Sequence, residues 1–245
     1  MHTIKRALAG IATSVLLVLA LSPTGCTQAG SALNGSGKII DRSIDISDFD
    51  SLEASGVFDL QISHSASFQV TLSTDDNLIN RVLFSLDGTT LKMKIEAPAA
   101  FFPTTLNVKI TLPQLRSLNL QDAAQATVTI LESIHSFNLV LAEGSFLKGD
   151  LAADLTNFYL SGQSQVSLKG KSKMLELDAA GGSQLNLGSF LLSGANVKLR
   201  EASTALLNVD GDLNIVLKDA SKIIYLGNPL IKNTSITGDS SMIHQ

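Results

Sequence analysis

The second half of the chain repeats a short unit, in which apolar residues alternate with polar ones and a corner of small or acidic residues follows. "IVLKDAS", which ends at Ser221, is a clear copy, and "FYLSGQS", which ends at Ser164, is another. The seven corners end at Ala124, Ser145, Ser164, Ser183, Ser203, Ser221 and Ser240, at intervals of 18 to 21 residues. The chain therefore carries a repeat of about 19 residues whose apolar positions recur with a period of two rather than 3.6.

A period of two places successive side chains on opposite faces of a strand, so each strand has one dry face. One short unit cannot bury that face alone, whereas stacked units bury it in a continuous core. We therefore predict an all-β chain that folds as a parallel β-helix-like solenoid of about 19-residue coils. The small corner residues fit this prediction, because stacked coils lie about 4.8 Å apart and bulky corner side chains would collide. An ordinary β-sandwich with evenly spaced strands is the alternative.

The region before the repeats is less regular. Residues 51–63 form a degenerate copy of the unit, and residues 67–74 and 105–113 alternate as strands do. Asp87-Gly88 between two apolar runs predicts a hairpin, and a short helical or turn segment is expected at 76–81. An irregular β region of this kind would cap the open end of a solenoid. We predict one β-helical domain at 36–245, with irregular N-terminal coils at 36–115 and regular coils at 116–245.

The N-terminus has the pattern of an export signal. Lys5 and Arg6 precede an apolar run, Ala7 to Leu21, whose length suits a signal peptide better than a membrane span. Cys26 is the only cysteine in the chain, and it follows this run within "SPTGC". A Gly-Cys pair at this place resembles the lipobox of bacterial lipoproteins, in which the cysteine is acylated and becomes the first residue. Cleavage after Ala29, without lipidation, is the alternative.

We therefore expect a signal peptide at 1–25, followed at 26–35 by a lipidated Cys26 and a flexible tether. Several acyl chains on one cysteine anchor a protein stably, where one chain would be marginal. Thr27 stands where an aspartate would indicate retention at the inner membrane of enteric-type bacteria. An outer-membrane lipoprotein is the expected form, and the membrane is then a partner through the lipidated N-terminus.

Charge narrows the choice of other partners. The chain has 18 basic and 22 acidic residues, and the leader holds two of the basic ones and none of the acidic ones. The part beyond the leader therefore carries a net charge of about −6, which argues against nucleic acid and against an anionic membrane surface as partners. With Cys26 acylated, neither disulfides nor thiolate chemistry is available.

Three stretches in a fixed order resemble one known family. They are "GSGKIIDRSIDISDFDSLEASGVFDLQI" at 35–62, "DDNLINRVLFSLDGTTLKMKI" at 75–95 and "TLPQLRSLNL" at 111–120, followed by the repeated corners. This order resembles the "putative auto-transporter adhesin head GIN domain" family over about residues 35–245. Family corners are typically Ser-Gly-Ala-Ser-Asp, and here only 161–164 is close to that pattern. The resemblance implies a right-handed β-helix and an envelope location, often as a lipoprotein, but no activity.

Acidic residues recur at one position of the corners. Asp122, Glu143, Glu201 and Asp219 occupy equivalent places, so Asp122 is expected to stack over Glu143 and Glu201 over Asp219. Like charges at the spacing of stacked coils cost free energy unless a cation bridges them, which makes these four residues candidate metal ligands for two Ca²⁺ sites. Solvated turn acids that splay apart are the alternative.

No sequence pattern identifies a catalytic or cofactor-binding residue. The sequence has no nucleophile elbow and no glycine-rich phosphate loop. Aromatic platforms for sugar rings are scarce, because Trp is absent and Tyr occurs only twice. We therefore expect a non-catalytic, lipid-anchored module of the cell envelope, without a cofactor, that binds a glycan or an envelope protein in the manner of an adhesin.

Two other functions stay open. One is a polysaccharide-active β-helix enzyme, a lyase or a hydrolase. The other is a structural self-assembly module, in which the edge coil at 234–245 pairs with another copy of the chain and forms a homo-oligomer.

Overall fold

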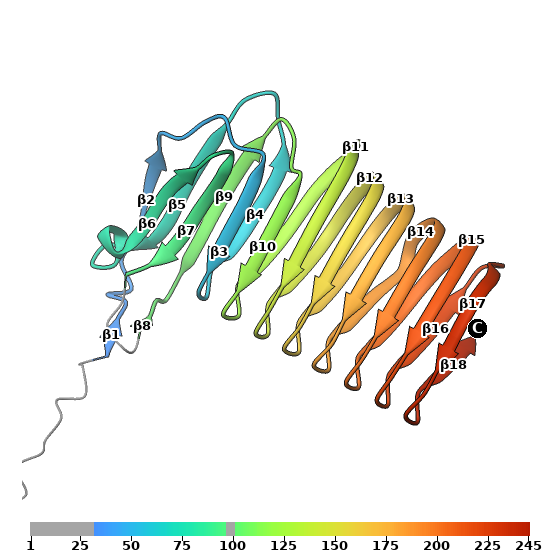
Figure 1. The fold of residues 1–245 in the computed structure, drawn as a ribbon. Helices are drawn as coiled ribbons and strands as arrows, with labels where there is room; N and C mark the ends of the chain where they lie inside the picture. The colour runs from blue at the N-terminus through green and yellow to red at the C-terminus, as the bar shows by residue number, and fades with distance from the viewer. Residues whose placement is uncertain (1–31, 97–100) are drawn as a thin grey trace, which may run out of the picture.

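The computed structural model describes residues 32–96 and 101–245 as an almost entirely β structure (Figure 1). The N-terminal strands are β1 (Leu33–Asn34), β2 (Ile39–Ile44), β3 (Ser51–Ser55), β4 (Asp59–His64), β5 (Gln69–Asp75), β6 (Val82–Asp87), β7 (Thr90–Ile95), β8 (Phe101–Phe102) and β9 (Leu106–Leu112). The strands of the repeats are β10 (Ser117–Gln121), β11 (Gln125–Leu141), β12 (Phe146–Leu160), β13 (Gln165–Ala179), β14 (Gln184–Leu199), β15 (Thr204–Leu217), β16 (Lys222–Leu226), β17 (Leu230–Ile236) and β18 (Ser241–His244).

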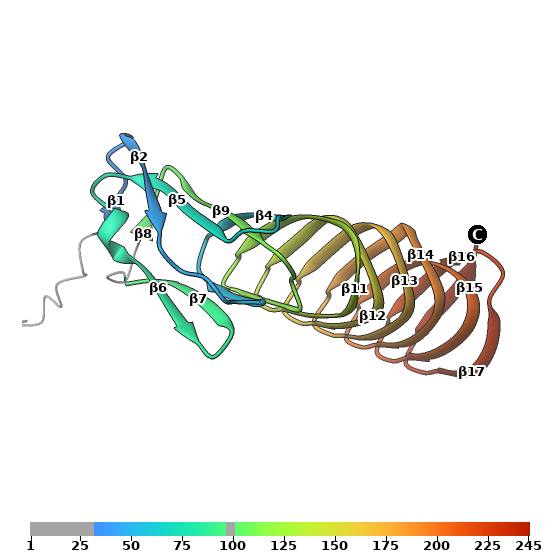
Figure 2. The ribbon, with the colours of Figure 1, turned by 90° about the horizontal axis from the view of Figure 1, so that it is seen from above.

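The repeats form a parallel solenoid of about seven coils, as predicted. Each long strand from β11 to β15 pairs in parallel with the next one, and register shifts separate the two sides of the coil in three of these four pairs. Both sides of the coil therefore stack along one axis (Figures 1 and 2). We call the sheet made by the residues before each corner the pre-corner sheet; it contains β7, β3, β10 and β17 at its ends. The sheet made by the residues after each corner is the post-corner sheet; β4, β16 and β18 belong to it.

Alternation along each strand builds the core. Inward positions stack into columns along the axis, and one column runs through Leu118, Leu139, Phe158 and Leu177, of which none is more than 3% exposed. Stacking of identical positions satisfies the backbone through the parallel ladders and removes the apolar faces from water. Most outward positions of the same strands are polar, which explains the period of two in the sequence.

The N-terminal region caps this core. β2, β5 and β9 form an antiparallel sheet, and β9 then pairs in parallel with β4 of the post-corner sheet. The predicted hairpin is confirmed, since β6 and β7 pair antiparallel on either side of Asp87–Thr90. The expected helical segment at 76–81 is a single 3-10 turn, η1 (Ile79–Arg81). The degenerate copy at 51–63 provides β3 and β4, which pair with β10 and β11 as the first coil.

Three consecutive residues hold the segment that leads into the cap. Asp75 accepts hydrogen bonds from the Gly37 N–H at 2.7 Å and from the N–H and hydroxyl of Thr104 at 2.9 and 2.6 Å. Asp76 forms an ion pair with Lys38 at 3.2 Å, and the amide of Asn77 donates to a carbonyl of β1 at 2.9 Å. The described end of the expected tether is thus fixed to the cap, and β1 pairs with β8.

Asp75 is fully buried in this arrangement. Burial alone raises the pKa of its carboxyl, but the hydrogen bonds from the Thr104 hydroxyl and from the backbone N–H groups of Gly37 and Thr104 outweigh burial. The pKa of Asp75 therefore lies below its ordinary value, and the carboxylate is charged in the folded protein at neutral pH.

Candidate functional site

The corners form a ridge along the solenoid. In each corner two consecutive residues have left-handed backbone angles, for example Asp122 (φ 56°) and Ala123 (φ 63°). Hydrogen bonds join one corner to the next, such as that from the Ala123 N–H to the Glu143 carbonyl at 3.0 Å. Two left-handed residues in succession define a type I′ turn, which matches the right-handed twist of strands. The ridge is therefore a stack of type I′ turns.

The first pair of candidate metal ligands lies together on this ridge. Asp122 accepts a hydrogen bond from the Ser55 hydroxyl, and this bond together with a hydrogen bond shared with Glu143 holds its pKa below the ordinary value. The same contact and the charge of Asp122 raise the pKa of the Glu143 carboxyl. Asp122 thus stacks against Glu143 as expected. The hydrogen bond between the two carboxyl groups forms when one of them carries a proton.

The second pair also occupies adjacent corners. The Ala202 N–H, next to Glu201, donates to the carbonyl of Asp219 at 2.8 Å. Over the part of the chain that the structure describes, however, no group of three or more His, Cys, Asp or Glu side chains gathers as a metal site would require. Cation binding by Asp122, Glu143, Glu201 and Asp219 stays a prediction.

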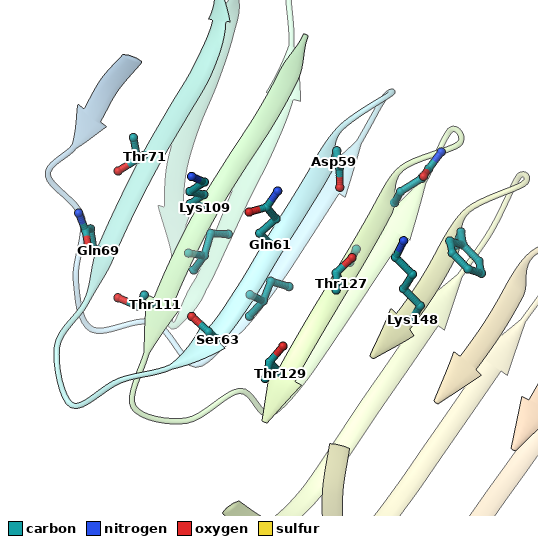
Figure 3. Close-up of a pocket in the computed structure, with 15 residues that line it drawn as sticks. Asp59, Gln61, Ser63, Gln69, Thr71, Lys109, Thr111, Thr127, Thr129 and Lys148 are labelled. Carbon is teal, nitrogen blue, oxygen red and sulfur yellow. The ribbon is translucent and has the colours of Figure 1, made fainter. Parts of the chain in front are cut away.

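A polar hollow on the post-corner sheet is the more developed site, and sequence reasoning did not find it. It has a volume of about 630 Å³ and extends over β5, β9, β4, β11 and β12. Outward side chains line it, and Figure 3 shows them rising from successive strands. Amides, hydroxyls and two ammonium groups make up most of this lining.

The register of the strands sets the order of these side chains. Gln61 on β4 pairs with Lys109 on β9 and, on its other side, with Thr127 on β11. Thr127 in turn pairs with Lys148 on β12. The four side chains therefore form one row across β9, β4, β11 and β12 (Figure 3). Neighbouring strands lie about 4.8 Å apart, so the two lysines at the ends of the row are about 14 Å apart along the axis.

A second row borders the first on the side of the corners. It contains Asp59, Gln125 and Phe146 in register on β4, β11 and β12. Phe146 is half-buried and also lines a second hollow of about 320 Å³, which continues over β13 to β16. Gln165, Gln184 and others extend the lining there. We call the two hollows together the trough; Phe146 joins its two parts.

The opposite face carries amide side chains with a structural role. Asn157 donates to Asn138 at 2.7 Å, Asn214 donates to Asn196 at 2.7 Å, and Asn233 donates to Asn214 at 2.6 Å. These bonds connect stacked coils along the pre-corner sheet. Because the amides bond one another there, that sheet offers fewer unsatisfied groups to a ligand than the trough does.

The aromatic residues divide between core and surface. Five phenylalanines are buried in the core: Phe49, Phe58, Phe137, Phe158 and Phe190. Phe146 is the aromatic residue of the trough, whereas Tyr159 is 54% exposed on the pre-corner sheet. Tyr225 is buried, and its ring stacks on that of His244 with 4.7 Å between the ring centroids.

Fold and trough together define a capped parallel β-solenoid that presents an extended polar face. The chain belongs to the family described as "Putative auto-transporter adhesin, head GIN domain", whose family model matches residues 48–229. The predicted resemblance is thereby confirmed.

Solved structures share the fold at low sequence identity. A putative adhesin from Bacteroides fragilis superposes with a TM-score of 0.77 at 15% identity, over 87% of this chain and 98% of that one. A putative adhesin from Parabacteroides merdae gives 0.72 at 16% identity, over 87% and 99%. A protein from Parabacteroides distasonis described as a putative lipid binding protein gives 0.72 at 17%, over 88% and 100%. None of the curated proteins matches the chain significantly.

The expected signal peptide and Cys26 lie outside the described residues, so export and lipidation stay predictions. In the described ranges, no helix has the length and apolar character needed to cross a membrane.

Proposed function

We propose that this protein is a lipid-anchored module of the cell envelope that binds a glycan in the trough and carries out no chemistry on it. The observation that carries the proposal is the composition of the trough, where amide, hydroxyl and ammonium groups from five strands face a common hollow. Such groups match the hydroxyl-rich surface of a sugar chain, and rigid strands hold them in fixed positions. Membership of an adhesin-named family supports the same proposal.

The lining also favours binding over catalysis. A glycoside hydrolase places two carboxyl groups on either side of the scissile bond. The hollow over β5 to β12 is lined by one carboxylate, Asp59, and by no histidine. This composition supports a binding role and disfavours the hydrolase form of the polysaccharide-active alternative.

One structural neighbour is described as a putative lipid binding protein, which suggests a second ligand class. A lipid tail needs an enclosed apolar pocket. The trough is instead a hollow on the surface of a sheet, where amide, hydroxyl and ammonium groups lie among the apolar ones, so we propose the glycan rather than a lipid as its ligand.

A glycan-binding panel with the purified mature protein tests the proposal. We expect selective binding that Gln61→Ala weakens, since Gln61 lies in the middle of the lysine-bounded row. Gln121→Ala is the matched control, because Gln121 lies on the pre-corner sheet and its amide bonds Asn119 at 3.3 Å. Equal loss of binding in both variants, or no binding to any glycan, would contradict the proposal.

Anchoring and location need a separate experiment. Metabolic labelling with a fatty acid should mark the wild type and not Cys26→Ser. Protease treatment of intact cells should cut the domain if it faces outward, which would favour adhesion. Protection until the outer membrane is opened would place it in the periplasm and would favour an envelope partner.

Self-association is a second candidate function, supported by strand β17. All seven of its residues are exposed, and Leu230, Ile231 and Ile236 are 58%, 37% and 39% exposed. Among the described strands β17 pairs only with β15, so its other edge and its three apolar side chains favour pairing with a second strand. We propose that Ile231→Lys abolishes any concentration-dependent dimer in sedimentation; a wild type that stays monomeric at high concentration would remove this candidate.

A further inference from the structure

The charge of the trough is opposite to that of the protein. Beyond the leader the chain has a net charge of about −6, from 16 basic and 22 acidic residues. The trough nevertheless contains Lys109 and Lys148 in its first part and Lys222 in its second, against the single carboxylate Asp59. An acidic protein therefore concentrates positive charge on the face that is shaped for a ligand.

The ammonium groups of these three lysines form no ion pair with any described residue. Some other basic groups do pair with acids, as Lys92 does with Asp87 at 2.8 Å and Arg200 does with Asp178. No such pair involves Lys109, Lys148 or Lys222. Unpaired ammonium groups within a concave surface attract anions, since the surrounding protein focuses their field.

The spacing of the lysines favours a long ligand over a small anion. An exposed ion pair contributes only about 0 to 1 kcal/mol, so one lysine would hold a single anion weakly. Lys109 and Lys148 lie about 14 Å apart in one row (Figure 3), which an extended chain can span and a small anion cannot. Once one anionic group of a chain is bound, the next group is held close to its lysine, so several weak contacts together give a higher affinity than any one of them.

Between the lysines the row offers hydrogen bonds rather than further charge. Gln61 and Thr127 separate them, and Phe146 on the neighbouring row presents an apolar surface suited to the face of a sugar ring. Proteins that bind single-stranded nucleic acid use several stacking aromatics in a densely basic groove, and this trough has one aromatic residue. A flat anionic membrane would not enter a concave surface.

We propose that the trough binds an acidic polysaccharide, whose chain lies parallel to the solenoid axis and whose anionic groups contact Lys109 and Lys148. This inference rests on the proposed glycan-binding function and specifies its ligand. The long axis of the trough runs across the strands, so the polymer crosses them and meets equivalent positions of successive coils.

Calorimetric titration of the mature protein with two acidic chains, polygalacturonate and chondroitin sulfate, tests the proposal. The neutral reference is fully methyl-esterified polygalacturonan, which keeps the backbone and removes the charge. We expect the acidic chains to bind at least tenfold more tightly than the esterified one, and monomeric galacturonate not to bind measurably. Raising the salt from 20 to 150 mM should weaken binding of the acidic chains, because the contacts are exposed ion pairs.

Substitutions identify the site. Lys109→Gln and Lys148→Gln should each weaken binding of the acidic chains by up to about fivefold, the range of an exposed ion pair. The double variant should weaken it by about tenfold or more. Lys198→Gln is the matched control, because Lys198 is exposed on the pre-corner sheet and forms no ion pair within the described structure. Lys109→Arg should retain binding, and circular dichroism confirms that each variant is folded.

The outcomes separate the two proposals. Equal affinity for the acidic and esterified chains would overturn the acidic ligand and keep the glycan-binding function. Absence of binding to these chains and to the whole glycan panel would overturn both. Loss of affinity in Lys198→Gln equal to that in Lys109→Gln would show non-specific attraction and overturn the site. Binding of oligo-dT with the same affinity as the acidic chains would assign the trough to nucleic acid and overturn the inference.

Discussion

Replacing Ser164 with alanine should lower the stability of the solenoid, whereas the same replacement at Ser203 should raise it. Both serines occupy the last position of a corner, and both are fully buried. The Ser164 hydroxyl donates to the carbonyl of Ser161 at 2.6 Å, and the same bond recurs in other corners. The Ser203 hydroxyl is buried without a hydrogen-bond partner. The two serine side chains therefore differ in burial by nothing and in hydrogen bonding by one bond.

The expected magnitudes follow from that difference. An intramolecular hydrogen bond contributes about 1 kcal/mol net, so Ser164→Ala should cost about that much. A buried hydroxyl without a partner costs about 1 to 3 kcal/mol, so its removal in Ser203→Ala should stabilise the protein by about 1 to 2 kcal/mol. Alanine fits the position, because Ala124 occupies it in the first corner. At about 2 to 4 °C per kcal/mol for a domain of this size, the variants should melt about 4 to 12 °C apart.

Thermal and urea unfolding of both variants, followed by circular dichroism, measures the difference. Solenoids can open coil by coil, so amide exchange at the substituted corner should accompany the global measurement. Slower exchange in Ser203→Ala and faster exchange in Ser164→Ala are expected. Equal destabilisation of the two variants would refute the reasoning, since it would mean that the Ser203 hydroxyl makes a bond equivalent to that of Ser164.

Three further predictions concern the ridge and the cap. Gly162→Ala should melt at a lower temperature than Gly144→Ala. Both substitutions place an alanine in the left-handed region, which costs about 1 to 2 kcal/mol. At Gly162 the new Cβ would also lie 2.9 Å from the backbone nitrogen of Glu143, whereas at Gly144 it would meet no atom within 4 Å. Folding lowers the pKa of Asp75, so the charged carboxylate stabilises the folded protein. This stabilisation is present above the unfolded-state pKa of about 3.9. It is lost as the pH falls through the pKa of the folded state. Asp75→Asn should therefore be less stable than the wild type in urea at pH 7, and the gap should close in acid; a constant gap would contradict this. Glu143→Gln should stabilise the protein at pH 7, because the contact with Asp122 raises the pKa of Glu143, and the gain should vanish in acid; a pH-independent effect would contradict it.

The repeat could be predicted because its causes are local in the sequence. Alternation within "IVLKDAS" fixes which side chains face inward, and the interval between corners fixes the coil length. The hairpin at Asp87-Gly88 was equally readable, since its turn residues and flanking strands are contiguous. The confirmed solenoid with its cap thus follows from patterns that span at most about twenty residues.

The reason for the corner composition was only partly readable. Small residues were interpreted as a consequence of close stacking, and the structure adds that both central positions of each corner need left-handed backbone angles. Gly181-Gly182 satisfies that need without strain, whereas Glu201-Ala202 does not. A type I′ turn was hidden because its usual signals, Asn-Gly and Asp-Gly, are replaced here by Asp-Ala and Glu-Ala.

The trough could not be predicted because its residues meet only through strand order. Lys109 and Gln61 are 48 positions apart in the sequence, but they are neighbours in the fold because β9 pairs with β4. β5 joins the same sheet by pairing with β9. The amide contacts of the opposite face left a clearer signal that was missed. Asn138, Asn157 and Asn214 each stand five residues before the first left-handed corner position, a fixed offset that indicates a ladder.

Net charge sums charges that the fold separates, so it does not give the charge of one face. The negative total argues against nucleic acid and against an anionic membrane surface as partners. Several of the acids, however, lie on the corner ridge, as Asp122 and Glu143 do, whereas Lys109 and Lys148 lie in the trough. A polyanion approaching such a surface is repelled along the ridge and attracted into the hollow beside it. On the proposed ligand, this separation would hold an acidic chain along the axis of the trough, with the ridge acids limiting its sideways movement. Neutralising the ridge with Glu143→Gln should then leave the affinity for polygalacturonate nearly unchanged at 150 mM salt. Its decline with salt should become slightly steeper, because removal of a repulsive charge raises the net attraction. A large loss of affinity would place the ligand on the ridge itself.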